Sequence, residues 1–204
     1  MTPQVQAIDA ALLAAHEHHD ARDAQAFGFW LYILSDLILF SSLFATFAVQ
    51  MRSFAGGPTG KDLFDLRYVA VETLLLLLSS ASYGLAMLAV QQGRSARVMR
   101  WLGVTFLLGL GFILMEVHEF YGLVLAGHGP DRSGFISAYF TLVGTHGTHV
   151  TFGLIWMAAM LFQVGFKGLS KPVAGRLLRL SVFWHFLDIV WIGVFSVVYL
   201  LGVM

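Results

Sequence analysis

Ionisable side chains lie inside all five long apolar stretches of this 204-residue sequence. An ionisable group at the centre of a helix in lipid costs ~2.5 to 3.5 kcal/mol, so each one needs a partner or a purpose. Carboxylates can hold protons, and imidazoles can also bind metals. Paired positions three residues apart lie on one helical face. The pairs are Glu116 with Glu119, His146 with His149, and His185 with Asp188, and the single residues are Asp36 and Glu72.

Five of these residues fall near the middle of their stretches, by the rise of ~1.5 Å per helical residue. We therefore predict a buried, hydrogen-bonded cluster that joins the first, fourth and fifth stretches. Its members are Asp36, His146, His149, His185 and Asp188.

The remaining carboxylates lie in the second and third stretches. Glu72 shares a helical stripe with Ser79 and Tyr83, which predicts a face turned toward other helices rather than lipid. For Glu116 and Glu119 two interpretations stay open. One is a proton relay, because carboxylates in lipid often mark proton paths. The other is structural pairing with Arg or Tyr near the outer membrane interface.

Metal or haem ligation is the more specific alternative interpretation of the histidines. Paired haem ligands on facing helices need a spacing of several turns, and His146 and His149 are too close for that. The run His16-Glu17-His18-His19-Asp20 has the composition of a metal-binding tract, although a solvated N-terminal segment is the ordinary explanation for it. The absence of cysteine excludes thiolate zinc sites, iron–sulfur clusters and cysteine nucleophiles. Phosphate loops, nucleophile elbows and zincin motifs are also absent, so we expect neither catalytic nor metal-binding residues on this chain.

The elements that position these residues are membrane helices. Hydrophobic residues make up 58% of the chain and charged residues 12%, against about 25% in soluble domains, and the mean hydropathy is +0.77. Equal numbers of basic and acidic residues argue against a nucleic-acid partner. We predict an all-α integral membrane protein with an N-terminal segment, 1–26, and a single transmembrane domain, 27–204. The five predicted spans are 28–50, 69–90, 101–125, 135–166 and 177–203.

The basic residues predict the orientation, because cytoplasmic loops carry an excess of Lys and Arg. The N-terminal side collects 8 of them and the opposite side 4. The N-terminus should be cytoplasmic and the C-terminus periplasmic. The richer side holds Arg22, Arg94, Arg97, Arg100, Lys167, Lys171, Arg176 and Arg179, and the other side holds Arg52, Lys61, Arg67 and Arg132.

Three motifs resemble subunit III of the haem-copper oxidases. The fourth stretch contains Gly144-Thr145-His146-Gly147-Thr148-His149-Val150, and the fifth contains Phe183-Trp184-His185-Phe186-Leu187-Asp188-Ile189-Val190-Trp191. The third ends in Glu119-Phe120-Tyr121. Within this family, the five-span form and two loops look closest to the bacterial cytochrome bo-type ubiquinol oxidases. These loops are Gly56-Gly57-Pro58-Thr59-Gly60-Lys61 and Gly129-Pro130-Asp131-Arg132-Ser133-Gly134-Phe135.

The resemblance implies a non-catalytic subunit of a proton-pumping complex in the bacterial inner membrane that oxidises ubiquinol and reduces oxygen. It implies haem b, haem o and copper on subunit I, and no cofactor on this chain. Subunit I would be the direct partner, with subunits II and IV in the same complex and phospholipids in a cleft of this subunit. Its implied roles are assembly, stability and lipid binding.

Two departures and several alternatives accompany this resemblance. Asp36 stands where the cytochrome c oxidases carry a carbodiimide-reactive Glu, and Glu116 stands where they carry a neutral residue. The chain could instead belong to a cytochrome c oxidase or a nitric oxide reductase-associated homologue. An autonomous membrane carrier and a membrane cytochrome are the alternatives from other classes. A carrier would usually show inverted repeats and broken helices, and neither is evident.

Overall fold

The computed structural model describes residues 3–56 and 60–202, with side chains described from residue 24 onward except at 61–62. Five helices are long and apolar enough to cross a membrane, which confirms the predicted number of spans and the all-α class. The elements are α1 (Pro3–Gln50), α2 (Gly60–Leu63), α3 (Leu66–Gln91), α4 (Ser95–Leu125), α5 (Gly134–Lys167), α6 (Lys171–Val194) and the π-helix η1 (Phe195–Leu200).

Helix α1 begins far ahead of the first predicted span. Its candidate membrane span is Ala24–Gln50, close to the predicted 28–50, but the helix itself starts at Pro3. Between Pro3 and Gly28 the sequence has no glycine or further proline and is rich in alanine, the strongest helix former. The helix therefore continues beyond the apolar stretch.

The chain divides into two compact units, Met1–Leu39 and Phe40–Met204. The first consists of the N-terminal part of α1, in which the side chains of Tyr32 and Asp36, one turn apart, interact through a hydrogen bond. The second contains the last turns of α1 and all the other elements.

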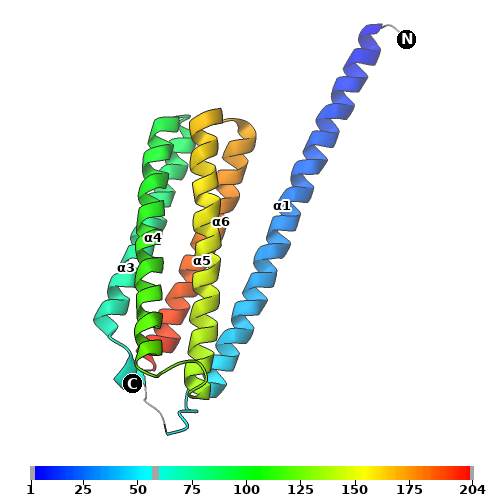
Figure 1. Ribbon diagram of the computed structural model, residues 1–204. Helices are drawn as coiled ribbons and strands as arrows, with labels where there is room; N and C mark the ends of the chain where they lie inside the picture. Colours follow the sequence, from blue (N-terminus) through cyan, green and yellow to red (C-terminus); the bar gives the residue numbers. More distant parts are fainter. Residues whose placement is uncertain (1–2, 57–59, 203–204) are drawn as a thin grey trace. The chain divides into compact units, whose positions relative to one another are not determined.

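Four long helices of the second unit form an antiparallel bundle. Helix α3 packs against α4 and α6, and α5 packs against α4 and α6, so the four close into a ring. The α3–α4 and α5–α6 turns lie at one end of this bundle, and the α4–α5 turn and η1 lie at the other (Figure 1). Gly93 and Gly127 end α3 and α4 with φ of 67° and 78°, a conformation that glycine adopts without strain.

Side-chain caps explain why two helices begin before the predicted spans. The Asp65 carboxylate accepts a hydrogen bond from the Arg67 amide at the start of α3, and the Ser133 hydroxyl accepts one from the Ile136 amide at the start of α5. Capping residues are polar, so a search for apolar stretches places the boundary late, by three residues at α3 and by one at α5. Helices α4 and α6 each begin six residues before the predicted spans, at Ser95 rather than 101 and at Lys171 rather than 177.

The core of the bundle is built around two tryptophans of α6. Trp184 and Trp191 are fully buried. Their indole N–H groups donate to the hydroxyls of Ser79 and Thr73 on α3, at 3.1 and 3.0 Å. These bonds connect α6 to α3 at two levels.

Candidate functional site

Three carboxylates meet inside the bundle, between α3 and α4. Glu72 is fully buried, and neither of its carboxylate oxygens has a hydrogen-bond partner among the described residues. Glu116 is 3% exposed, and its Oε2 likewise has no partner in that part of the chain. Glu119, one turn further along α4, lies within range of the charge of both. The burial of Glu72, Ser79 and Tyr83 confirms that their shared stripe faces other helices.

Two tyrosines connect Glu119 to the rest of the bundle. The Tyr199 hydroxyl of η1 donates to Glu119 Oε2 at 3.1 Å, and it lies 3.1 Å from the Tyr139 hydroxyl of α5. The Tyr139 hydroxyl also interacts with the Glu119 carboxylate, so the two tyrosines and Glu119 form one hydrogen-bonded group. Glu119 thus contacts a tyrosine, one of the two partner types named for it, and the structural and proton-relay interpretations of Glu116 and Glu119 both stay predictions.

Glycine in the fourth-span motif makes room for Glu116. A Cβ added at Gly147 would lie 2.8 Å from Cδ of Glu116, well inside the usual contact distance. The carboxyl group of α4 therefore packs directly on the backbone of α5, and only glycine at position 147 leaves the space that it occupies.

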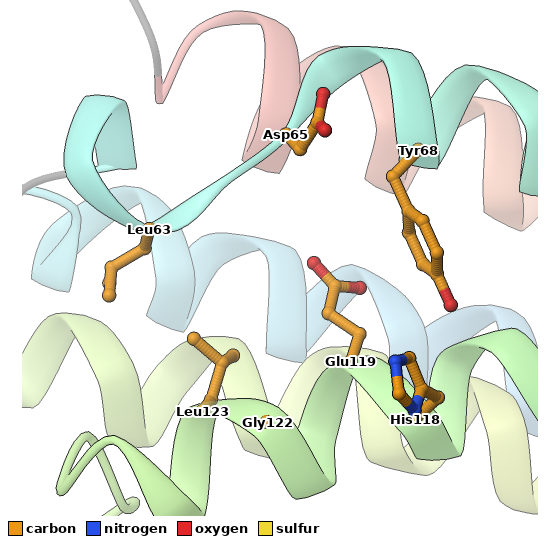
Figure 2. Close-up of a pocket in the computed structure, with 7 residues that line it drawn as sticks. All are labelled: Leu63, Asp65, Tyr68, His118, Glu119, Gly122 and Leu123. Carbon is orange, nitrogen blue, oxygen red and sulfur yellow. The ribbon is translucent and has the colours of Figure 1, made fainter.

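A pocket opens beside the carboxylates, at the bundle end that holds the α4–α5 turn. Its volume is about 290 Å³, and Tyr68, His118 and Glu119 contribute polar side chains to its lining. Asp65 lies at its rim, and Leu63, Gly122 and Leu123 complete the wall (Figure 2). The Tyr68 hydroxyl donates to the Met115 carbonyl at 3.0 Å, which holds α3 against α4 next to the pocket. Glu119 thus lies between the pocket and the buried carboxylates.

The histidine and aspartate of the fifth-span motif form a different contact. His185 Nδ1 lies 2.6 Å from the hydroxyl of Ser80 on α3, and the Asp188 carboxylate also interacts with Ser80 and with His185. The predicted cluster contained no residue of the second span, so Ser80 was missed. The adjacent serines 79 and 80 in an otherwise apolar run were the available signal.

The histidines of the fourth-span motif bond to backbone carbonyls. His146 is fully buried, and its Nε2 lies 3.2 Å from the Leu187 carbonyl of α6. His149 Nδ1 lies 2.8 Å from the Thr145 carbonyl, one turn back on its own helix. Both rings also contact the ring of Phe40. His146 therefore joins α5 to α6, whereas the bond of His149 stays within α5.

The predicted five-residue cluster is only partly described by these contacts. His146, His185 and Asp188 each contact a neighbouring helix, but through separate bonds to the Leu187 carbonyl and to Ser80. Asp36 belongs to the N-terminal unit, so its place in such a cluster stays a prediction. Residues missed by sequence reasoning are Tyr139, Tyr199 and Ser80, because neutral hydroxyls carry no strong signal in an apolar helix.

Groups of three or more His, Asp or Glu side chains placed to hold a metal ion do not occur among the described residues. The side chains of the histidine-rich run 16–20 lie outside that description.

Comparison with known proteins then assigns the family. A family model described as "Cytochrome c oxidase subunit III" matches residues 6–203, nearly the whole chain. The chain belongs to the cytochrome c oxidase subunit III family.

Several curated members of the subunit III family are similar over most of their length. The "Cytochrome bo(3) ubiquinol oxidase subunit 3" of Pseudomonas putida is 59% identical over 186 residues, which cover 91% of this chain and 90% of the relative. The protein of the same name from Pseudomonas aeruginosa is 55% identical over 188 residues, covering 92% and 90%. The "Cytochrome c oxidase subunit 3" of Bacillus sp. strain PS3 is 41% identical over 175 residues, covering 86% and 84%.

Several residues of the motifs that resemble subunit III connect neighbouring helices. The fifth-span motif supplies both indole N–H groups and His185, all bonded to hydroxyls of α3. The fourth-span motif supplies His146, which bonds to α6, and Gly147, which receives Glu116 of α4. In this subunit III chain, the motif residues thus hold neighbouring helices in register.

Proposed function

We propose that this chain is the third, non-catalytic subunit of a cytochrome bo-type ubiquinol oxidase in the bacterial inner membrane. The observation that carries the proposal is the identity of 55% to 59%, over about nine-tenths of both chains, to two subunits of that name. Such identity over the full length favours an oxidase subunit over an autonomous carrier or a membrane cytochrome.

The contacts inside the bundle support a structural role. Several polar side chains of the bundle interior bond to a neighbouring helix, as Ser80 does with His185 and His146 with the Leu187 carbonyl. Large apolar side chains point outward instead, among them Leu114 on α4 and Phe152 and Phe162 on α5, each more than 60% exposed. These faces suit lipid or an apolar partner helix.

The proposal assigns the redox chemistry to a partner. Subunit I would be the direct neighbour and would hold haem b, haem o and copper, with subunits II and IV in the same complex. This chain would bind no redox cofactor and would stabilise subunit I, while phospholipids cover its remaining apolar surface. The polar groups that would connect helices in this role are His146, His185 and Asp188. A contribution of Asp36 and His149 to the same cluster stays a prediction.

The orientation belongs to the same proposal. The α3–α4 and α5–α6 turns, which lie at one end of the bundle, carry most of the basic residues, and we place that end and segment 1–26 in the cytoplasm (Figure 1). The chain has no cysteine, so single cysteines can report the side. A membrane-impermeant thiol reagent added outside spheroplasts should label Asp131→Cys and spare Ser170→Cys. The reverse pattern would overturn the orientation.

Purification from the native membrane tests the function. A tagged chain, isolated in mild detergent, should bring down a larger subunit and oxygen consumption that depends on ubiquinol. Activity with reduced cytochrome c instead would favour the second candidate, a cytochrome c oxidase subunit III, which the 41% identity to the Bacillus protein of that name supports. Isolation without any oxidase subunit or activity would refute both.

A further inference from the structure

The structural role leaves the three carboxylates between α3 and α4 unexplained. A polar group that only ties helices together needs a hydrogen-bond partner, as Ser80 and His146 have. Glu72, fully buried, has none at either oxygen among the described residues, and Glu116 has none at Oε2. Hydrogen bonding between helices therefore does not account for the burial of either side chain.

Repulsion between the negative charges of these carboxylates limits how many of them can be ionised at once. Like charges repel more strongly inside a protein than in water, because the effective dielectric constant there is lower. Glu72, Glu116 and Glu119 lie within range of one another's charge, so they cannot all be ionised without a large cost. A proton is the smallest group that removes a negative charge and occupies an oxygen without a partner. The other ionisable groups that face them are Tyr68 on α3, Tyr139 on α5 and Tyr199 on η1, with Asp65 and His118 at the pocket.

The pocket supplies the route to solution. Glu119 lines the pocket and also interacts with Glu72 and Glu116. Its carboxylate also accepts the hydrogen bond from Tyr199, which stabilises the ionised form of this one member. His118 and Asp65 line the same pocket, so groups that can exchange protons with water surround the opening (Figure 2).

We propose that Glu72, Glu116 and Glu119 form a proton-binding site that exchanges protons with solution through the pocket beside Glu119. In each exchange one carboxyl O–H bond breaks, the proton passes to the Glu119 carboxylate, and from there it forms a bond with a water molecule in the pocket. No electron is transferred. With the orientation proposed above, the pocket opens at the periplasmic end of the bundle.

Infrared spectroscopy of the purified oxidase complex tests the site. A protonated carboxyl group has a C=O stretch that is lost on ionisation and shifts in heavy water. We expect Glu72→Gln and Glu116→Gln each to remove part of this band. Glu119→Gln should slow its hydrogen–deuterium exchange by about a hundredfold, the lower end of what a positioned proton-transfer group contributes.

Asp131→Asn, in the exposed α4–α5 turn, is the control and should change neither quantity. An unaltered band in both Gln variants would overturn the proposal, as would unaltered exchange in Glu119→Gln. Should the Gln variants fail to assemble, Glu72→Asp and Glu116→Asp keep an acid at each position. Each should then shift the band frequency, and an unshifted band would also overturn the proposal. Haem content and ubiquinol oxidase activity of the same preparations report separately on the proposed function.

Discussion

Trp184 is confined between two glycines, so a methyl group at either glycine should destabilise the bundle. A Cβ added at Gly109 on α4 would lie 2.8 Å from Cη2 and Cζ2 of Trp184 and 3.1 Å from Cδ2 of Leu154. Gly153 of α5 lies against the same indole, and the Ser79 hydroxyl holds its N–H. The ring therefore has little freedom to move away from Ala at position 109.

The size of the effect follows from two opposing contributions. Replacing glycine by alanine inside a helix gains about 1 kcal/mol of helix propensity. Overpacking a well-filled core costs about 1–3 kcal/mol. Gly103 lies two turns earlier on α4, and a Cβ there would meet nothing within 4 Å. Gly103→Ala should therefore stabilise the chain, and Gly109→Ala should be less stable than Gly103→Ala by about 1–3 kcal/mol, because the propensity gain cancels between them.

Equilibrium unfolding in detergent micelles, followed by tryptophan fluorescence, measures this difference. Adding Trp184→Phe to Gly109→Ala should recover part of the loss, because the smaller ring leaves room for the methyl group. The packing argument would be refuted if Gly109→Ala were as stable as Gly103→Ala, or if Trp184→Phe gave no recovery.

Three further substitutions test other contacts by the same unfolding measurement. Gly147→Ala should cost about 1–3 kcal/mol, because its methyl would press on the Glu116 carboxyl, and Glu116→Ala in the same chain should restore most of the loss. Ser80→Ala should cost about 1–3 kcal/mol, because it removes the partner of His185 Nδ1. Tyr199→Phe should cost a similar amount, about 1–3 kcal/mol, since it removes the buried hydroxyl that bonds to a carboxylate and to a second tyrosine.

Each of these variants has a matched control whose side chain lies away from the contact. Gly122→Ala adds a methyl in open space on α4, and Tyr121→Phe alters an exposed ring. Ser196→Ala removes only a hydroxyl that bonds to the Ile192 carbonyl, four residues back along the chain. Each should change the free energy of unfolding by less than about 1 kcal/mol in the destabilising direction. A control that destabilises as much as its partner would contradict the assigned contact.

The spans were predictable because the bilayer demands about 20 apolar residues for each, and hydropathy reports that demand directly. The inward face of Glu72, Ser79 and Tyr83 followed from helical periodicity alone. The start of α1 could not be predicted from hydropathy. The boundaries of a membrane span follow hydropathy, whereas the boundaries of a helix follow backbone propensity and caps.

The carboxylate site was predictable only in part. The spacing of Glu116 and Glu119 placed both on one face of a helix, and the tyrosine partner was among the interpretations left open. Their proximity to Glu72 depends on α3 packing beside α4, and Tyr199 reaches Glu119 from the π-helix that follows α6. Helix order and a widened turn of this kind leave no periodic trace in a single sequence, so these contacts required the structure.

The reduced-minus-oxidised spectrum of the tagged complex, recorded before and after the other subunits are stripped away, tests the central claim most directly. We expect haem bands in the intact preparation that vanish from the isolated chain, because this chain would stabilise a haem-bearing partner without binding haem itself. Haem bands that stay with the isolated chain would contradict the account and would make His146, His149 and His185 the ligands to examine.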